Sequence, residues 1–157
     1  MPEQFTHLHV ASSYSLRFGA SHPDALVERA AEHGMDSLAL TDRDGVYGAV
    51  RFVNACQRAG ISPILGADLA VHETGSAPFG STVGGTPAKG GRIRDQRFPR
   101  VTFLASSSRG WAALCRLISA AHAQAAVNQG QPVCTPELLT KYLPGSDLLV
   151  LLGPASA

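Results

Sequence analysis

The chain has few cysteines and almost no net charge, and each shortage excludes a class of protein. Its three cysteines, Cys56, Cys115 and Cys134, form no CxxC pair, which argues against a disulfide scaffold and a zinc ribbon. The 13 basic and 12 acidic residues give a net charge of +1, which is too small to draw the chain to nucleic acid or to an anionic membrane. A chain of 157 residues is long enough to fold around its own apolar core.

Long apolar runs and nucleotide-binding motifs are also missing. No run approaches the ~20 apolar residues of a membrane span. The start of the chain, MPEQFTH, lacks the basic and apolar regions of a signal peptide. Gly45 and Gly48 do not form a GxGxxG fingerprint, and no phosphate-binding GxxxxGK[ST] loop is found. We therefore expect a cytoplasmic protein with no membrane partner and no dinucleotide cofactor.

The residues that are present form patterns that alternate between strands and helices. Short apolar runs are typical of buried strands, and apolar residues at i, i+3 and i+4 are typical of helices. Ser21 is placed to cap the first helix, and Gly34 and Gly60 follow two helical patterns, as glycine does at helix ends. The predicted strands are 6–10, 37–41, 61–71, 100–105 and 148–152, and the predicted helices are 21–34, 46–59, a stretch including Trp111 and His122, and 135–142.

Residues 73–99 interrupt this alternation. They are rich in glycine, serine, threonine and proline and have no apolar period, which predicts a flexible insertion. Alternating strands and helices with buried parallel strands indicate the α/β class, either a barrel or an open sheet. Five strands are too few to close an α/β barrel, which takes about 200 residues or more.

Two histidines near the start of the chain carry the strongest chemical signal. His7 and His9 are two positions apart in a predicted strand, so their side chains are expected on one face. Paired imidazoles that meet carboxylates from later strands are typical of metal-assisted hydrolytic sites. The segment TDRDG contains Asp42 and Asp44, which we interpret as turn residues, with Asp44 able to cap the next helix.

Several stretches together resemble a known family. They are HLHVASSYSL, GASHP, LVERAAEHGMDSLALTD, DGVYGAVRFVNAC, AGISPILGADL and GWAALCRLISAAH. The chain resembles a PHP (polymerase and histidinol phosphatase) domain, and more specifically the N-terminal PHP domain of bacterial DNA polymerase III alpha subunits of the error-prone branch. The resemblance implies a distorted seven-stranded α/β barrel, of which residues 1–157 hold about the first five strands. No polymerase palm, fingers or thumb is present.

The resemblance also implies which residues occupy the family's metal-ligand positions. Three positions keep residues that can bind a metal, namely His7, His9 and Asp68. Three others do not, because Phe18, Arg43 and Arg100 stand where the family has acidic or histidine ligands. Phenylalanine has no donor atom, and arginine stays protonated with no lone pair to offer a cation.

These losses lead to a hypothesis about charge. Arg43 and Arg100 can pair with Asp42, Asp44 or Asp68, since guanidinium groups bind carboxylates bidentately. We expect fixed arginine charge to replace metal charge, which would leave a structural salt-bridge cluster and no cofactor. An open site with Zn or Mn held by His7, His9 and Asp68 stays an alternative, because three protein ligands suffice for such a site.

The resemblance implies a segment of an error-prone DNA polymerase that acts in replication, translesion synthesis and repair as a full-length protein. Its partners would be the remainder of that polymerase and accessory proteins, and it would reach DNA only through the full-length protein. Two other functions stay open. One is a metal-dependent phosphoesterase or 3′–5′ exonuclease that uses His7, His9 and Asp68, and the other is a free-standing interaction module with an exposed sheet edge.

Overall fold

A computed structural model describes residues 5–72, 98–125 and 131–153. Most of the predicted insertion at 73–99 therefore lies outside the described residues. The described part holds a five-stranded sheet and four helices, which confirms the predicted α/β class. In chain order these elements are α1 (Pro23–Glu32), β1 (Ser37–Arg43), α2 (Ala49–Ala59), β2 (Ser62–Val71), β3 (Arg100–Ala105), α3 (Ser108–Ala123), β4 (Val133–Cys134), α4 (Pro136–Tyr142) and β5 (Leu148–Leu151).

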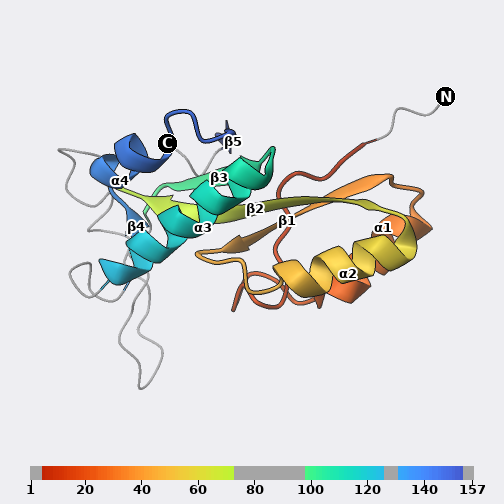
Figure 1. Ribbon diagram of the computed structural model, residues 1–157. Coiled ribbons are helices and arrows are strands. Elements are labelled where there is room, and N and C mark those ends of the chain that lie inside the picture. The colour runs from red at the N-terminus through yellow and green to blue at the C-terminus, as the bar shows by residue number, and fades with distance from the viewer. Residues whose placement is uncertain (1–4, 73–97, 126–130, 154–157) are drawn as a thin grey trace, which may run out of the picture.

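The long strand β2 organises the sheet (Figure 1). Strand β1 runs parallel to it, from the pair Ser37 and Ser62 to the pair Arg43 and Asp68. Beyond that point the short strand β4 takes over on the same edge and pairs with the last residues of β2. Strand β3 pairs with the opposite edge, and β5 lies beyond β3.

The parallel pairing expected for the strands is observed for β1, β2 and β4 but not for β3 and β5. Both β3 and β5 pair antiparallel to their neighbours. A buried strand has the same apolar run in either direction, so its composition does not reveal its orientation. Gly66 is required at this junction, because a Cβ there would lie 2.4 Å from the backbone oxygen of Phe103 on β3.

Two apolar clusters pack against different parts of the sheet. Helices α1 and α2 lie side by side and cover β1 and the first part of β2, whereas α3 and α4 cover the region of β3 and β4 (Figure 1). The largest fully buried side chain of the first cluster is Phe52, and Phe103, Leu114 and Leu117 fill the second. Burial of one such side chain contributes about 1.5–3 kcal/mol, so each half has a core of its own.

Helix ends follow the predictions in part. Helix α2 ends at Gly60, whose φ of +71° suits glycine, and α4 begins after the Thr135 cap, as predicted. The predicted Ser21 cap was wrong, because His22 occupies the N-cap position of α1 without a side-chain cap bond. Helix α2 begins at Ala49 and not at 46, since Val46 packs against the second cluster.

The predicted strand at 6–10 is not a regular strand. The backbone oxygens of His7 and Val10 accept hydrogen bonds from Ala39 and Thr41 of β1, at 3.0 and 2.8 Å. His7 and Val10 are three positions apart in the sequence, whereas their partners on β1, Ala39 and Thr41, are only two apart. The pairing therefore loses its register between these two hydrogen bonds. The Val10 N–H donates to the Thr41 hydroxyl at 2.9 Å and not to a backbone oxygen. The segment therefore runs beside β1 without regular alternation of its side chains.

No helix within the described ranges is long and apolar enough to cross a membrane. Strand β5 lies at the edge of the sheet, where Leu149 and Val150 are about half exposed.

Candidate functional site

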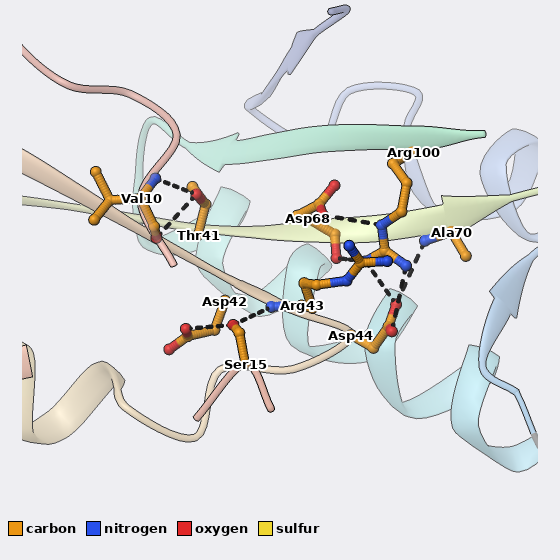
Figure 2. Close-up of polar contacts among 9 residues, drawn as sticks. All are labelled: Val10, Ser15, Thr41, Asp42, Arg43, Asp44, Asp68, Ala70 and Arg100. Atoms are coloured by element: carbon orange, nitrogen blue, oxygen red, sulfur yellow. Dashed lines mark hydrogen bonds and ion pairs between the residues drawn. The ribbon is translucent and has the colours of Figure 1, made fainter. Parts of the chain in front are cut away.

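The ends of the parallel strands β1 and β2 bring the predicted site residues together. Asp42 and Arg43 close β1, and Arg43 is in register with Asp68 on β2. Asp44 follows at once, with a φ of +56° that turns the chain away from the sheet. Its N–H donates to the backbone oxygen of Asp68 at 2.9 Å, which fixes the turn against β2. Figure 2 shows Asp68 and Asp44 converging on Arg100, the first residue of β3, whereas Asp42 lies against Ser15.

Asp42 is buried and is surrounded by neutral donors. Its carboxylate accepts the backbone N–H of Ser12 at 2.7 Å and the Ser15 hydroxyl at 2.7 Å. The Ser12 hydroxyl donates as well, at 2.8 Å to Oδ2. A carboxylate taken out of water needs such donors, because a buried unpaired charge is strongly unfavourable. The network also ties residues 12–15 to the end of β1.

Asp68 is equally buried but is bound by a cation. The Nε of Arg100 donates to Asp68 Oδ2 at 2.9 Å, and a terminal nitrogen of Arg100 donates to the Asp68 backbone oxygen. The same terminal nitrogen also donates to the Asp44 carboxylate at 3.0 Å. The second terminal nitrogen of Arg100 donates to that carboxylate at 3.4 Å. The Arg100 side chain is only 12% exposed, so solvent screens these ion pairs weakly.

Asp44 joins this cluster to α3 and β2. Its Oδ1 accepts the N–H of Ala70 at 3.4 Å, and its backbone oxygen lies 2.6 Å from Nε2 of His122. A carbonyl can only accept, so Nε2 of His122 carries the proton. The prediction that Asp44 caps α2 was wrong, because Gly48 holds that position and Asp44 is bound to Arg100. Residue type could not reveal this, since aspartate suits both roles.

Arg43 has a different neighbour from Arg100. Its guanidinium carbon lies 3.6 Å from the centre of the Phe18 ring, which is a cation–π contact. Its backbone N–H donates to the Ser15 hydroxyl at 2.9 Å. Two of the positions without ligand chemistry, Phe18 and Arg43, thus contact each other. Phe18 is 61% exposed, so this pair lies at the surface.

The structure does not gather His7, His9 and Asp68 into a metal cradle. Both histidines are exposed on the irregular segment before β1, and the ring of His7 meets that of Phe5 edge-on at 4.7 Å. Across residues 5–72, 98–125 and 131–153, no three His, Cys, Asp or Glu side chains are grouped as a metal site requires. An oxygen of Asp68 is already bound to Arg100.

Cys134 lies close to the same cluster. The pKa of its thiol is raised to about 12, chiefly by burial and also by the Asp44 carboxylate, whereas Arg100 opposes this shift. The thiol is therefore neutral near pH 7 and is neither a nucleophile nor a metal ligand in this form. The cluster itself offers fixed charge and hydrogen bonds.

Three residues of the site were missed in the sequence. Ser12 and Ser15 hold Asp42, and His122 holds the Asp44 backbone. The two serines are three residues apart in ASSYS, a spacing that allows both hydroxyls to face one acceptor in a tight turn. His122 gave no such signal, because it comes from a helix far along the chain.

Comparison with known proteins agrees with this fold. The PHP domain model matches residues 7–156. An error-prone DNA polymerase of Symbiobacterium thermophilum is 40% identical over 98% of this chain, and one of Mycobacterium bovis is 36% identical over 90% of it. The chain spans only 11% and 12% of the lengths of these two relatives.

Among solved structures, an amidohydrolase from Chromobacterium violaceum superposes with a TM-score of 0.51 at 22% identity. The match covers 76% of this chain and 34% of that one, and it supports the fold alone. The resemblance found in the sequence is therefore confirmed, since the family model and the polymerase relatives both cover most of the chain. The chain belongs to the PHP domain family.

Proposed function

We propose that this chain is the PHP-domain segment of a longer error-prone DNA polymerase, and that its role there is structural. In this proposal DNA synthesis, translesion synthesis and repair belong to the full-length protein in the cytoplasm. The relatives named error-prone DNA polymerase support the first part, because the chain matches about a tenth of their length. Its partners would be the rest of the polymerase and its accessory proteins, and DNA would be contacted only by the complete protein.

The contacts of Arg100 carry the structural part of the proposal. Its guanidinium holds Asp68 and Asp44 together at 2.9 and 3.0 Å, where a hydrolytic member of the family would need a cation. A divalent ion placed ~4 Å from that guanidinium would be repelled by about 8 kcal/mol at an effective dielectric constant of ~20. A site with Asp68 so engaged favours a metal-free, degenerate centre in which arginine supplies the positive charge.

Enzyme assays test this proposal directly. Purified protein is incubated with p-nitrophenyl phosphate, and separately with a 3′-labelled single-stranded oligonucleotide, in the presence of added Mn²⁺ or Zn²⁺. We expect no turnover above that of the variant His9→Ala. Turnover that requires His9 would refute the structural role and establish the alternative, a phosphoesterase or exonuclease that uses His7, His9 and Asp68.

A gain-of-binding variant tests the assignment of the lost ligand positions. The triple change Phe18→Asp, Arg43→His and Arg100→His restores oxygen and nitrogen donors and removes two cations. We expect Mn²⁺ affinity to rise in this variant, measured by calorimetric titration, because the repulsion is gone and ligands are added. An unchanged affinity in a folded triple variant would show that these three positions were assigned wrongly.

A further inference from the structure

Two neighbouring segments expose more large apolar side chains than an isolated domain needs. They are the loop before α1 and the segment that leads into α2. Their apolar residues are Tyr14 (39% exposed), Leu16 (81%), Phe18 (61%), Tyr47 (64%) and Val50 (75%), which we call the loop patch. Single exposed apolar residues are common on soluble proteins, but five together mark an interaction surface.

The two segments form one surface. The ring of Tyr14 packs so close to Gly48 that a Cβ there would lie 3.1 Å from it. The Ser15 hydroxyl accepts the Arg43 N–H at 2.9 Å, and the Arg43 guanidinium covers Phe18. In Figure 1 the loop before α1 lies beside the first turn of α2. The two segments therefore adjoin at Tyr14 and Gly48.

The loop before α1, which holds part of the loop patch, is fixed by contacts with the buried end of β1. The buried Asp42 carboxylate binds Ser12 and Ser15 inside the loop. Gly19 allows the loop to close, since a Cβ there would lie 2.0 Å from the Ser12 backbone oxygen. Arg17 has a φ of +73°, an unfavourable conformation that persists only where neighbouring contacts impose it. A surface ordered before binding loses less entropy when a partner docks.

The charges around the loop patch indicate which charges a partner surface would have. Arg17 is exposed beside Leu16, and Arg43 is partly exposed over Phe18. Of the carboxylates close to these segments, Asp42 is buried and bound by serines, and Asp24 is paired with both Arg51 and Arg58. The border is therefore positive, and a matching surface would have acidic residues around an apolar centre. Aromatic residues and arginine are enriched at the centres of protein interfaces.

A protein partner fits better than single-stranded nucleic acid. The two most exposed members, Leu16 and Val50, are aliphatic, and bases stack on aromatic rings and not on aliphatic chains. The net charge of +1 also gives little attraction to phosphate. The polymerase relatives are about nine times longer than the chain, which spans 11% of one of them. A large polypeptide would therefore lie beside this surface.

We infer that the loop patch docks an apolar, acidic-bordered segment of the polypeptide that follows Ala157 in the longer polymerase. This inference rests on the proposed function, since it requires that polypeptide to exist. It adds the surface through which the PHP segment would support the polymerase. Phe18 is also one of the lost ligand positions, but the docking is argued from exposed apolar side chains and does not depend on whether the site is metal-free.

Hydroxyl-radical footprinting of the 157-residue chain and of the full-length gene product tests this inference. We expect oxidation of Leu16, Phe18 and Tyr47 to fall about fivefold in the full-length protein, because an interface core excludes water. His33, exposed at the end of α1, is the internal control and should be oxidised equally in both. In the full-length variant Leu16→Ser/Tyr47→Ser we expect oxidation of Phe18 to return, whereas Phe5→Ser, at an exposed residue outside the patch, should leave it protected.

Each other outcome overturns the inference in a distinguishable way. A gene product that ends at Ala157 removes the partner and refutes the proposed function as well. A longer product in which the loop patch stays oxidised refutes the docking alone. Protection in the 157-residue chain that grows with its concentration would identify a second copy as the partner. Protection that appears only after an oligothymidylate is added would identify nucleic acid.

Discussion

Two buried aspartates at neighbouring strand ends are stabilised by different kinds of donor. Asp42 on β1 is 1% exposed and accepts hydrogen bonds from Ser12 and Ser15, which carry no charge. Asp68 on β2 is 5% exposed and is bound by the guanidinium of Arg100. The serines come from residues close to α1, whereas Arg100 comes from β3. Asp42 therefore holds the loop before α1 against β1. The bonds between Asp68 and Arg100 hold β2 and β3 together with the turn at Asp44.

This difference predicts how each half responds to substitution. A neutral network loses hydrogen bonds when it is altered, and each is worth about 0.5–1.5 kcal/mol net. A buried ion pair that loses one partner leaves an uncompensated charge, which costs about 3–5 kcal/mol. We therefore expect changes at the Arg100 cluster to be more severe than changes at Asp42.

The largest effect is expected for Arg100→Met. This variant keeps much of the side-chain volume but leaves Asp68 without its cation, so we expect a loss of about 3–5 kcal/mol in the free energy of unfolding. Urea denaturation followed by circular dichroism measures it. The double variant Arg100→Met/Asp68→Leu removes both charges and should recover much of the loss. A loss below about 1 kcal/mol in the single variant would show that this pair behaves like an exposed one.

Asparagine at each aspartate gives the sharpest matched comparison. Asp68→Asn removes a charge-assisted bond, so we expect a loss of about 1.5–3 kcal/mol. Asp42→Asn keeps an oxygen for the serine donors and presents its amide to a hydroxyl that can accept, so we expect about 1 kcal/mol. Both are measured as shifts of the urea midpoint at unchanged slope. Equal losses would mean that the charge of the partner does not matter.

The reactivity of two buried cysteines measures local unfolding of the two apolar clusters separately. Burial raises the pKa of Cys56, in the first cluster, to about 11 and that of Cys134, in the second, to about 12. The thiolate is the reactive form, so both should react slowly with iodoacetamide at pH 8 in the folded protein. Arg100→Met should accelerate alkylation of Cys134 more than that of Cys56, by about tenfold for each 1.4 kcal/mol of easier opening. Asp42→Asn should show the reverse preference.

The same thiols predict instability in alkali. The ordinary cysteine pKa of 9.0 applies to the unfolded chain, and the folded values lie higher. Unfolding then releases protons above pH 9, so stability should fall as pH rises from 9.0 toward 11 and 12. Denaturation midpoints measured across this range for the wild type and for Cys134→Ala test the sign. A wild type whose stability changes no more than that of the variant would contradict a neutral buried Cys134.

A partly exposed aspartate provides the smallest effect. Asp147 is hydrogen-bonded to Arg109 and to Ser107, which lower its pKa. The contribution of Asp147 to folding stability is present above its pKa in the unfolded chain. This contribution is lost as pH falls through its lower pKa in the folded protein. We expect Arg109→Met to shift the urea midpoint less than any variant above, because solvent screens exposed pairs. A shift as large as that of Asp42→Asn would contradict this ranking.

The sequence predicted features that depend on neighbouring residues and missed those that depend on strand pairing. Strand β3 was predicted with its observed bounds at 100–105, and the end of α2 was fixed by Gly60. Both are local features, since apolar runs and glycine act within a few residues. The orientation of β3 and the short strand β4 depend on pairing with β2, which no local pattern records.

The site was predicted less completely than the fold. The sequence predicted that Arg100 could pair with Asp42, Asp44 or Asp68, but it could not show that Asp44 and Asp68 are the two that it binds. The strand expected for His7 and His9 is irregular because the segment loses register with β1. The serines that hold Asp42 were missed, since their role depends on a turn that forms only against the end of β1.

The most direct measurement of the central claim is a Mn²⁺ titration of the wild-type protein, followed by electron paramagnetic resonance of the free ion. If Arg100 supplies the positive charge at Asp68, the free Mn²⁺ signal should rise in proportion to added metal, as in buffer alone. One tightly bound Mn²⁺ per chain, absent in both His9→Ala and Asp68→Asn, would contradict it.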